Sequence, residues 1–412
     1  MAGGIEVITF GCRLNSHESE ILRDILGEAR ERGAFGARDV VVFNSCAVTS
    51  EAERQLRQSI RKIRMERGSQ VLLGVVGCAA ETNGATYREM PEVNFVIGAG
   101  GRLRLESYTS LGKDPHTVPD GLSSEALTFR GVQRFERRAR GSVKIQDGCD
   151  NHCTFCLTRF ARGRSLSAPP AEVLEQIKKL VDLGYREIVL TGVNLCDYGR
   201  GLEPPLGLGK LVEMAIREAS PERLRLSSLD PAALDPDLIE QIKYEKHLMP
   251  HLHLSLQSGN SRILERMGRR HSREDVLRLA EDILGTRAEV VFGADLIAGF
   301  PGETEAMHRD SVTIIGELPI VYGHIFPYDS RPGTAAASMA AQIPRALKRE
   351  RARQLREAAA ANLAKLRDSL RGTEQRVFVE TAGIGRLENY LQVPLGEDHS
   401  GDIGNIVTTT VL

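Results

Sequence analysis

The first 105 residues alternate between short apolar runs and longer amphipathic stretches. Apolar side chains recur at helical spacing between residues 16 and 32, and the run DVVVF at 39–43 is typical of a buried strand. A second helix is predicted over residues 50–67, with Ser50 as its N-cap. Four strands are expected, at residues 5–10, 39–43, 70–76 and 93–97. Strands that alternate with helices in this order indicate a small parallel α/β sheet.

The same alternation continues on a larger scale over residues 135–365. Helical patterns cover residues 170–183, 208–218 and 273–284. Six strands are expected between the helices, at residues 142–145, 187–191, 223–227, 251–257, 289–297 and 324–327. Six β-α units in series predict a partial parallel (β/α)6 barrel, with its chemistry at the carboxyl ends of the strands.

The remaining segments complete an α/β chain of four predicted parts, residues 1–107, 108–134, 135–365 and 366–412. The second part contains GKDPHTVPDGLSS, whose Gly, Pro and Ser content is typical of a linker. A long basic helix is expected over residues 344–371, followed by the strand-like runs RVFVE and IVTTTVL. From residue 373 onward the sequence contains six acidic residues and two basic ones. An acidic surface repels phosphate.

The composition is that of an ordinary globular chain of 412 residues, 41% hydrophobic and 26% charged. This length is enough for two or three domains with sizeable cores. The net charge is −1, so nucleic-acid binding would have to come from local basic patches. The first residues show no secretory signal pattern. A membrane span needs about 18 consecutive apolar residues, and no apolar run in the sequence comes near that length. We therefore expect a cytoplasmic protein without a membrane partner.

Three of the seven cysteines form a C-x3-C-x2-C run, the cysteine triplet Cys149, Cys153 and Cys156. Their odd number and tight loop argue against disulfides, whereas thiolates at this spacing can hold metal. Zinc prefers four ligands, and no fourth Cys or His completes a zinc knuckle here. A 4Fe–4S cluster on three thiolates leaves one iron open to a small molecule. The run resembles the signature of the radical S-adenosylmethionine (SAM) superfamily, where SAM chelates that iron through its amino and carboxylate groups. Zinc or an inert buried cluster remains the alternative.

Three further cysteines, Cys12, Cys46 and Cys78, each follow one of the first three predicted strands. They are 34 and 32 residues apart, the length of one β-α unit. Ligands in open α/β sheets bind at the carboxyl ends of the strands. These auxiliary cysteines therefore predict a second cluster, and the alternative is three unrelated buried thiols.

Polar side chains alternate with leucines in HLHLSLQSG, so His251, His253, Ser255 and Gln257 share one strand face. A polar face is costly to bury without partners, so it indicates a solvated or ligand-filled barrel lumen. We expect the two histidines to form hydrogen bonds rather than to bind metal. Glycine-rich turns in TGVN and GADLIAGFPGE end two further strands, and their backbones can approach a ligand closely.

A closer resemblance rests on motifs that occur in order along the chain: FGCRLN, NSCAVT, GCAA, KIQDGCDNHCTFC, ARGRSLS, TGVN, HLHLSLQSGN and GADLIAGFPGET. Together they resemble the radical SAM methylthiotransferases over nearly the whole chain. The resemblance implies an N-terminal domain with one cluster, a radical SAM partial barrel with another, and a C-terminal β-rich TRAM domain. Residues 366–412 are short for a TRAM domain, so we expect a TRAM-like segment.

The resemblance also implies the cofactors and their ligands. It places one 4Fe–4S cluster on Cys149, Cys153 and Cys156, and an auxiliary 4Fe–4S cluster on Cys12, Cys46 and Cys78. With the strand-end turns, it marks candidate SAM contacts at Phe155, Thr191, Gly192, Asn194, Ser255, Gln257, Ile297 and Gly299. Core packing is the alternative for Phe155. No side chain is assigned as a catalytic acid or base, and Cys196 is expected to be a buried thiol.

The family's reaction uses SAM twice. One SAM donates a methyl group to sulfur associated with the auxiliary cluster, and another is cleaved reductively to a radical that removes hydrogen from C2 of an adenine. The motifs NSCAVTSEAERQ, KIQDGC and HIFPYDSRPGTAAA most resemble the bacterial branch that converts N6-threonylcarbamoyladenosine (t6A) at position 37 of tRNA to ms2t6A. The alternatives are methylthiolation of isopentenyladenosine in tRNA, methylthiolation of a ribosomal-protein aspartate, and a non-catalytic iron–sulfur protein.

Basic residues flank the cysteine triplet on both sides. The candidate RNA contacts are Arg134, Arg137, Arg138, Arg140, Arg159, Arg162 and Arg164. Such a patch attracts phosphates, and an adenosine in the tRNA anticodon loop is already partly unstacked. One of Arg162 and Arg164 is also a candidate partner for the threonyl carboxylate of the substrate. A solvated basic surface is the alternative. We further expect a monomer that requires an electron donor and a sulfur source, neither of which the sequence identifies.

Overall fold

The computed structural model describes residues 3–111, 129–132, 135, 139–396, 399 and 401–411. The chain forms two compact units. The N-terminal unit comprises Met1–Arg134, Asp147–Asn151 and Cys156–Leu166, and the barrel unit comprises Phe135–Gln146, His152–Phe155 and Ser167–Leu412. The four-part division expected from the sequence remains a prediction, and most of its linker lies outside the described residues.

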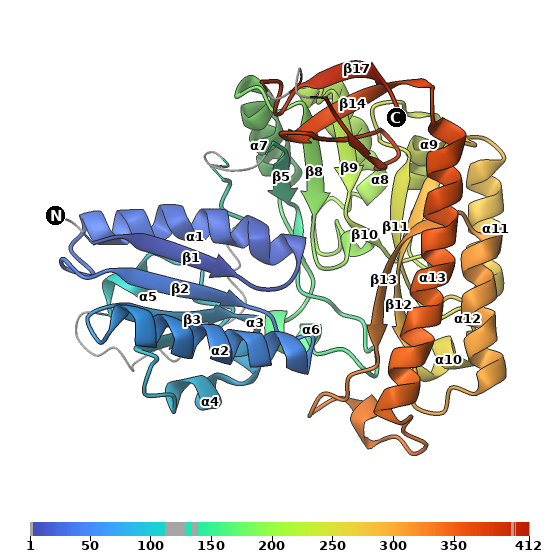
Figure 1. Ribbon diagram of the computed structural model, residues 1–412. Coiled ribbons are helices and arrows are strands. Elements are labelled where there is room, and N and C mark those ends of the chain that lie inside the picture. Colours follow the sequence, from blue (N-terminus) through green and yellow to red (C-terminus); the bar gives the residue numbers. More distant parts are fainter. Residues whose placement is uncertain are drawn as a thin grey trace. The chain divides into compact units, whose positions relative to one another are not determined.

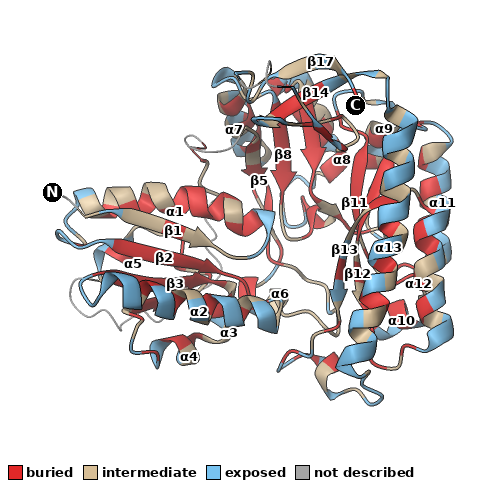
Figure 2. Cartoon of the chain, in the orientation of Figure 1, coloured by how far each residue is buried: buried red, intermediate tan, exposed pale blue. Residues whose placement is uncertain are grey.

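The N-terminal unit is built on a four-stranded parallel sheet in the order β1-β2-β3-β4. The strands are β1 (Ile5–Thr9), β2 (Val40–Ser45), β3 (Leu72–Gly77) and β4 (Phe95–Ile97). Strand β2 is buried along its whole length (Figure 2), as expected for a central strand of a parallel sheet covered on both faces. The predicted small parallel α/β sheet is confirmed.

Helices cover both faces of this sheet (Figure 1). They are α1 (Arg13–Glu31), α2 (Ser50–Arg67), α3 (Cys78–Thr82), α4 (Gly84–Arg88), α5 (Glu106–Thr109) and, after the cysteine triplet, α6 (Thr158–Arg162). Leu56 and Ile60 of α2 pack in one core with Val41 of β2. The N-cap of α2 is Thr49, whose side chain accepts a hydrogen bond from the Ala52 N–H at 3.1 Å. The prediction of Ser50 as N-cap was therefore wrong by one residue.

The barrel unit contains parallel strands in two hydrogen-bonded sheets, β5-β8-β9 and β10-β11-β12-β13. They are β5 (Gly141–Lys144), β8 (Glu187–Thr191), β9 (Arg223–Leu226), β10 (Ser228–Leu229), β11 (His251–Gln257), β12 (Val291–Ala298) and β13 (Ile320–Pro327). Strands β9 and β10 are one path interrupted at Ser227, and they pair with β8 and β11 respectively. This series of parallel strands confirms the predicted partial barrel. The short strands β6 (Gln146–Asp147) and β7 (Leu166–Ser167) lie on either side of the cysteine loop in the sequence.

Helices alternate with these strands along the chain. The α-helices are α7 (Pro170–Asp182), α8 (Leu208–Met214), α9 (Pro236–Tyr244), α10 (Ser261–Arg266), α11 (Arg273–Leu284), α12 (Glu305–Glu317) and α13 (Arg345–Leu370). Short 3-10 turns occur at η1 (Leu195–Asp197) and η3 (Ala335–Ser338), and a π turn, η2 (Ala215–Ala219), ends the predicted helix 208–218. Helix α13 lies along β13 (Figure 1). Among the helices in the described part of the chain, none has both the length and the apolar character needed to cross a membrane.

The C-terminal residues form an antiparallel sheet in the order β16-β15-β14-β17. Its strands are β14 (Glu374–Thr381), β15 (Ile384–Arg386), β16 (Gln392–Pro394) and β17 (Ile406–Thr410). Val377 and Val393 of this sheet pack against Leu366 and Leu370 of α13. The expected strand-rich C-terminal segment is thus confirmed.

Two buried arginines of β9 attach this sheet to the barrel. Arg223 donates to the backbone carbonyl of Arg376 at 2.8 Å, and Arg225 donates to the carbonyls of Leu387 and Glu388 at 3.0 and 2.8 Å. Acidic side chains of the tail also bond to barrel arginines: Glu380 pairs with Arg140 at 2.7 Å, and Glu388 lies 3.7 Å from Arg223. Glu380 and Glu388 therefore help to attach the acidic tail to the barrel.

Glu187 is the carboxylate at the centre of this arginine group. Its side chain is fully buried and forms ion pairs with Arg140, Arg225 at 2.8 Å and Arg223 at 3.7 Å. Burial alone would raise the pKa of Glu187, but Arg225 and Arg140 outweigh that effect and lower the pKa to about 2.

Replacing this carboxylate should destabilise the fold in a pH-dependent manner. We expect Glu187→Gln to lose about 3–5 kcal/mol of stability at neutral pH, because buried arginines lose their partner. The folded pKa lies below the ordinary value of 4.5, so the contribution is complete above about pH 4.5 and is lost as the pH falls toward about 2. Urea unfolding midpoints should therefore differ most at pH 7 and converge at acid pH. Glu213→Gln, at an exposed helical pair, is the control and should leave the midpoint unchanged. Equal midpoints for Glu187→Gln and wild type at pH 7 would contradict this assignment.

Candidate functional site

The auxiliary cysteines lie at one edge of the N-terminal sheet. Ser45 of β2 and Gly77 of β3 are register partners, so Cys46 and Cys78 follow adjacent positions on neighbouring parallel strands. Cys12 comes three residues after β1 and is the N-cap of α1. Parallel topology thus brings the three thiols, far apart in sequence, to the same edge.

Two glycines allow the backbone to approach closely at this edge. Gly11 has φ +103°, and a Cβ there would lie 2.6 Å from Cys46 Cβ and 2.9 Å from Cys46 Sγ. Gly77 has φ +91°, and a Cβ there would lie 2.7 Å from Asn44 Oδ1. Only glycine fits both the conformation and the space, so the loop before α1 packs directly against Cys46.

The donor set at this edge fits an iron–sulfur cluster. All seven cysteines are free thiols, and Cys12, Cys46 and Cys78 are close enough to affect one another's ionisation. Burial raises the pKa of Cys46 to about 11, and burial also raises the pKa of Cys78. A metal would have to displace these protons, as thiolate ligands require. The three thiolates would then hold three irons of a cluster and leave one position open.

Behind the auxiliary cysteines lies a group of four buried charged residues, here called the charge cluster: Glu18, Arg102, Asp147 and Arg162. Arg102 donates to Glu18 at 2.5 and 3.2 Å and to Asp147 at 3.3 Å. Arg162 donates to Glu18 at 2.9 and 3.1 Å and to Asp147 at 3.0 Å. Two positive and two negative side chains therefore compensate each other in the interior of the N-terminal unit.

Arg162 extends this cluster to the auxiliary thiols. Its Nε donates to Cys78 Sγ at 3.2 Å, and its Nη2 donates to Asn15 Oδ1 at 2.7 Å. The same Asn15 oxygen lies 3.8 Å from Cys12 Sγ. Arg162 is 5% exposed and already bonded to carboxylates, so in this conformation it is closed to phosphate and to the substrate carboxylate. Its expected role in RNA binding is therefore not compatible with its position.

The other candidate RNA contacts differ in their surroundings. Arg134, Arg137 and Arg138 lie outside the described residues. Arg140 is mostly buried between Glu187 and Glu380, which corrects the expectation of a free basic side chain. Arg159 is half-buried on α6. Arg164 is exposed, with 85% of its side chain accessible and only a loose pairing to Asp150 at 3.7 Å.

Two members of the cysteine triplet belong to the N-terminal unit. Cys149 donates its N–H to the Gly163 carbonyl at 3.1 Å. Gly148, with φ +72°, allows this approach, since a Cβ there would lie 1.8 Å from the Arg164 carbonyl oxygen. Cys156 Sγ accepts the Thr158 N–H at 3.4 Å just before α6 begins. The loop that carries the triplet is therefore held by backbone contacts on both sides of the cysteines.

Cys153 belongs to the barrel unit, where an arginine with a largely buried side chain lies beside it. Arg269 lies with Nη1 3.6 Å from Cys153 Sγ, while its Nη2 donates to Asp230 at 2.9 Å and to the Ser255 carbonyl at 3.0 Å. The Nε of Arg269 is buried and makes no hydrogen bond within the described part of the chain. Sequence reasoning missed Arg269; its position in GRRH, shortly after a lumen strand, was the available signal.

The candidate SAM contacts occupy the carboxyl ends of barrel strands. Thr191, Gly192 and Asn194 lie at the end of β8; Ser255 and Gln257 lie at the end of β11; Ile297 and Gly299 lie at the end of β12. Gln257 has φ +71°, and it follows a register shift between β11 and β12. The N–H groups of Val193 and Asn194 both donate to Gln146, at 2.9 and 2.8 Å. The fold thus gathers the candidate contacts at strand ends, where barrel chemistry occurs; their contact with SAM stays a prediction.

Phe155 and Cys196 each have a packing role. Phe155 is half-buried and meets Phe300 edge-to-face, with ring centroids 6.5 Å apart. Cys196 accepts the Asp230 N–H at 3.3 Å, and burial raises its pKa to about 12. Cys196 is half-buried, where a buried thiol was expected, and its raised pKa is that of an unreactive thiol.

Carboxylate and aromatic groups surround the histidines on the lumen face of β11. His253 Nε2 lies 3.1 Å from Asp295 of β12, and His324 Nδ1 of β13 lies 3.4 Å from the same oxygen. Burial alone would raise the pKa of Asp295, but the two histidines lower it to about 2. The ring of His251 stacks on the ring of Tyr390, with centroids 4.8 Å apart. The histidines thus have aromatic and carboxylate neighbours, and Asp295 is a partner that the sequence did not reveal.

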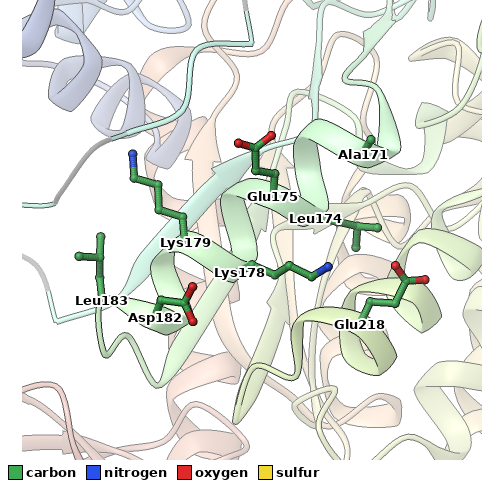
Figure 3. Close-up of a pocket in the computed structure, with 8 residues that line it drawn as sticks. All are labelled: Ala171, Leu174, Glu175, Lys178, Lys179, Asp182, Leu183 and Glu218. Atoms are coloured by element: carbon green, nitrogen blue, oxygen red, sulfur yellow. The ribbon is translucent and has the colours of Figure 1, made fainter.

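A separate surface hollow of about 690 Å³ lies over α7 (Figure 3). Its lining includes Glu175, Lys178, Lys179 and Asp182 of α7, and Glu218 of η2. The charges are mixed and no predicted site residue lines it, so this hollow provides no functional assignment.

Comparisons with known proteins agree with this geometry. Residues 143–314 match the Radical SAM superfamily, and residues 4–98 match the Uncharacterized protein family UPF0004. The threonylcarbamoyladenosine tRNA methylthiotransferase MtaB of Rickettsia prowazekii is 38% identical to this chain, over 95% of this chain and 91% of the relative. Proteins of the same name from Thermotoga maritima and Bacillus subtilis are 31% and 33% identical, over 91% and 98% of this chain and 86% and 92% of their own.

Among solved structures, the radical SAM methyltransferase TsrM of Kitasatospora setae has a similar fold. The TM-score is 0.60 at 15% identity, covering 82% of this chain and 77% of TsrM. This likeness supports the fold class only, and it confirms the radical SAM architecture expected from the motifs.

The position of Arg269 leads to a prediction about SAM binding. In radical SAM proteins the SAM carboxylate reaches the open iron, so a guanidinium beside Cys153 would lie near it. We expect Arg269→Ala to raise the Kd for SAM about tenfold to a hundredfold, the range for a lost charge-assisted hydrogen bond. Calorimetry on cluster-reconstituted protein measures this.

Arg270→Ala is the matched control for this experiment. Arg270 also pairs with Asp230, at 3.3 Å, but its side chain is 45% exposed and makes no described contact with cysteine sulfur. Equal losses of SAM affinity in the two variants would assign the effect to Asp230 and refute a SAM contact by Arg269.

Proposed function

Because the chain belongs to the radical SAM methylthiotransferases, we propose that it adds a methylthio group to C2 of t6A at position 37 of tRNA, giving ms2t6A. The observation that carries this proposal is the combination of two three-cysteine sets with 38% identity to a threonylcarbamoyladenosine tRNA methylthiotransferase over 95% of the chain. A radical SAM enzyme needs the triplet alone, so a second set of thiols supports a reaction that also requires sulfur.

The two sets of cysteines would contribute separate parts of the chemistry. When bound, a 4Fe–4S cluster and SAM supply the radical, and an auxiliary cluster would supply the site for sulfur. The cysteine triplet would hold the first cluster and the auxiliary cysteines the second. The chain's own side chains would bind and orient these groups: Arg269 would hold the SAM carboxylate, and the strand-end turns of β8, β11 and β12 would contact the rest of SAM.

No side chain need act as acid or base in this scheme. The buried titratable groups near the cysteines, Glu18 and Asp147, are each bonded to arginine, so they serve to balance charge. A substrate adenosine from the anticodon loop would enter with little cost of unstacking. The reaction would also require an electron donor and a sulfur source, and the monomeric state stays a prediction.

The decisive measurement is mass spectrometry of tRNA nucleosides from a strain that lacks this gene. We expect ms2t6A to disappear and t6A to accumulate, with recovery on complementation by the wild-type gene. Complementation by Cys78→Ala or Cys153→Ala should fail, whereas Cys196→Ala should restore the nucleoside.

Other outcomes separate the alternatives. Loss of methylthio-isopentenyladenosine would favour the second tRNA branch, and loss of the methylthio group from a ribosomal aspartate would favour the protein-modifying branch. Unchanged levels of all three products, with no SAM cleavage by reduced protein, would favour a non-catalytic iron–sulfur protein.

For tRNA binding, Arg164 is the exposed candidate beside the triplet. We expect Arg164→Ala to weaken tRNA binding and to reduce the salt slope of log Kd by about one, as for a lost phosphate contact. Filter binding across a salt series measures the slope. Arg278→Ala, at an exposed arginine of α11, is the control and should keep the wild-type slope. An unchanged slope in Arg164→Ala would place the tRNA contact elsewhere.

A further inference from the structure

The guanidinium of Arg162 has each of its five N–H donors directed at an acceptor. Nη1 donates to Glu18 and Asp147, and Nη2 donates to Asn15 and Glu18. The fifth donor, Nε, is directed at Cys78 Sγ at 3.2 Å. An arginine side chain has five N–H groups in a fixed planar fork, so this arrangement uses its full capacity.

The acceptor of the fifth hydrogen bond, Cys78 Sγ, bears on the charge of that cysteine. A neutral thiol is a weak acceptor, whereas a thiolate bound to metal accepts charge-assisted hydrogen bonds well. Burying an arginine is costly unless every donor finds a strong acceptor. The placement of Nε therefore suits a Cys78 that carries negative charge, as a cluster ligand does.

The charge cluster also offers a comparison that separates the contact with sulfur from the balance of charge. Arg102 and Arg162 balance Glu18 and Asp147, so the group is neutral while Cys78 is a thiol. Of the two arginines, Arg162 donates to sulfur, whereas Arg102 donates to the two carboxylates and to the Ala99 carbonyl. Arg102 thus provides an internal comparison, with similar burial and the same carboxylate partners.

From these contacts we propose that Arg162 is a positioning residue for the auxiliary cluster: it hydrogen-bonds the Cys78 thiolate and raises the reduction potential of that cluster. Hydrogen bonds to ligating sulfur and nearby positive charge favour the more negative, reduced state of an iron–sulfur cluster. The inference rests on the proposed auxiliary cluster. It also explains why an arginine adjoining the triplet loop is buried rather than exposed to RNA.

The test isolates the auxiliary cluster in the full-length protein by replacing Cys149, Cys153 and Cys156 with alanine. Two double variants are then compared, Arg162→Gln/Glu18→Gln and Arg102→Gln/Glu18→Gln. Each removes one positive and one negative charge, so each keeps the interior neutral, and only the first removes the N–H to Cys78. Iron content and EPR-monitored redox titration are the readouts.

We expect the protein without the triplet to retain the iron of about one 4Fe–4S cluster. We expect the reduction potential of the Arg162 double variant to be more negative than that of the Arg102 double variant. Equal potentials in two variants that both hold iron would overturn the role of Arg162 and leave the auxiliary cluster intact. Absence of iron from the triplet-free parent would overturn the auxiliary cluster itself. Should a double variant lose iron, the single variants Arg162→Gln and Arg102→Gln provide the second measurement. Each leaves one buried carboxylate unbalanced, so equal potentials in the two would refute the proposal, and a more negative potential in Arg162→Gln would support it.

Discussion

Two buried arginines and two buried carboxylates form the interaction on which the N-terminal unit depends. They come from four separate segments: Glu18 from α1, Arg102 from the loop after β4, Asp147 from the start of the cysteine loop, and Arg162 from α6. A buried charge is tolerated only with its partners present, so these segments must assemble together. As a result, Cys149 and Cys156 lie in the same compact unit as the auxiliary cysteines.

Much of the fold was predictable because it follows from local periodicity. Strands β8 and β11 and helix α11 have the bounds expected from the sequence pattern. The edge that carries the auxiliary cysteines was predictable too, because parallel strands expose their carboxyl ends at one edge. These features depend only on neighbours within one β-α unit.

Side-chain partners from distant segments were not predictable in this way. Arg162 and Arg164 stand two residues apart in one basic motif, yet the first is 5% exposed and the second largely free in solvent. The difference arises from Glu18, which lies 144 residues earlier in the chain. The sequence did not reveal the roles of Arg269 and Asp295 for the same reason. Arg269 is identified by its contact with Cys153, and Asp295 by its contacts with His253 and His324.

Because these arginines pair with buried groups, the number of basic residues in the sequence does not measure the positive charge at the surface. Arg140, Arg223 and Arg225 bind Glu187 and the C-terminal sheet, while Arg102 and Arg162 bind Glu18 and Asp147. A buried, paired arginine adds nothing to the field that attracts phosphate. The number of arginines around the cysteine triplet therefore overstates the attraction of this region for RNA. The buried arginines instead help to hold Cys149 and Cys156 in the same unit as the auxiliary cysteines. Among the described residues beside the triplet, Arg162 is bonded to buried carboxylates, and Arg164 is exposed and able to meet a polyanion.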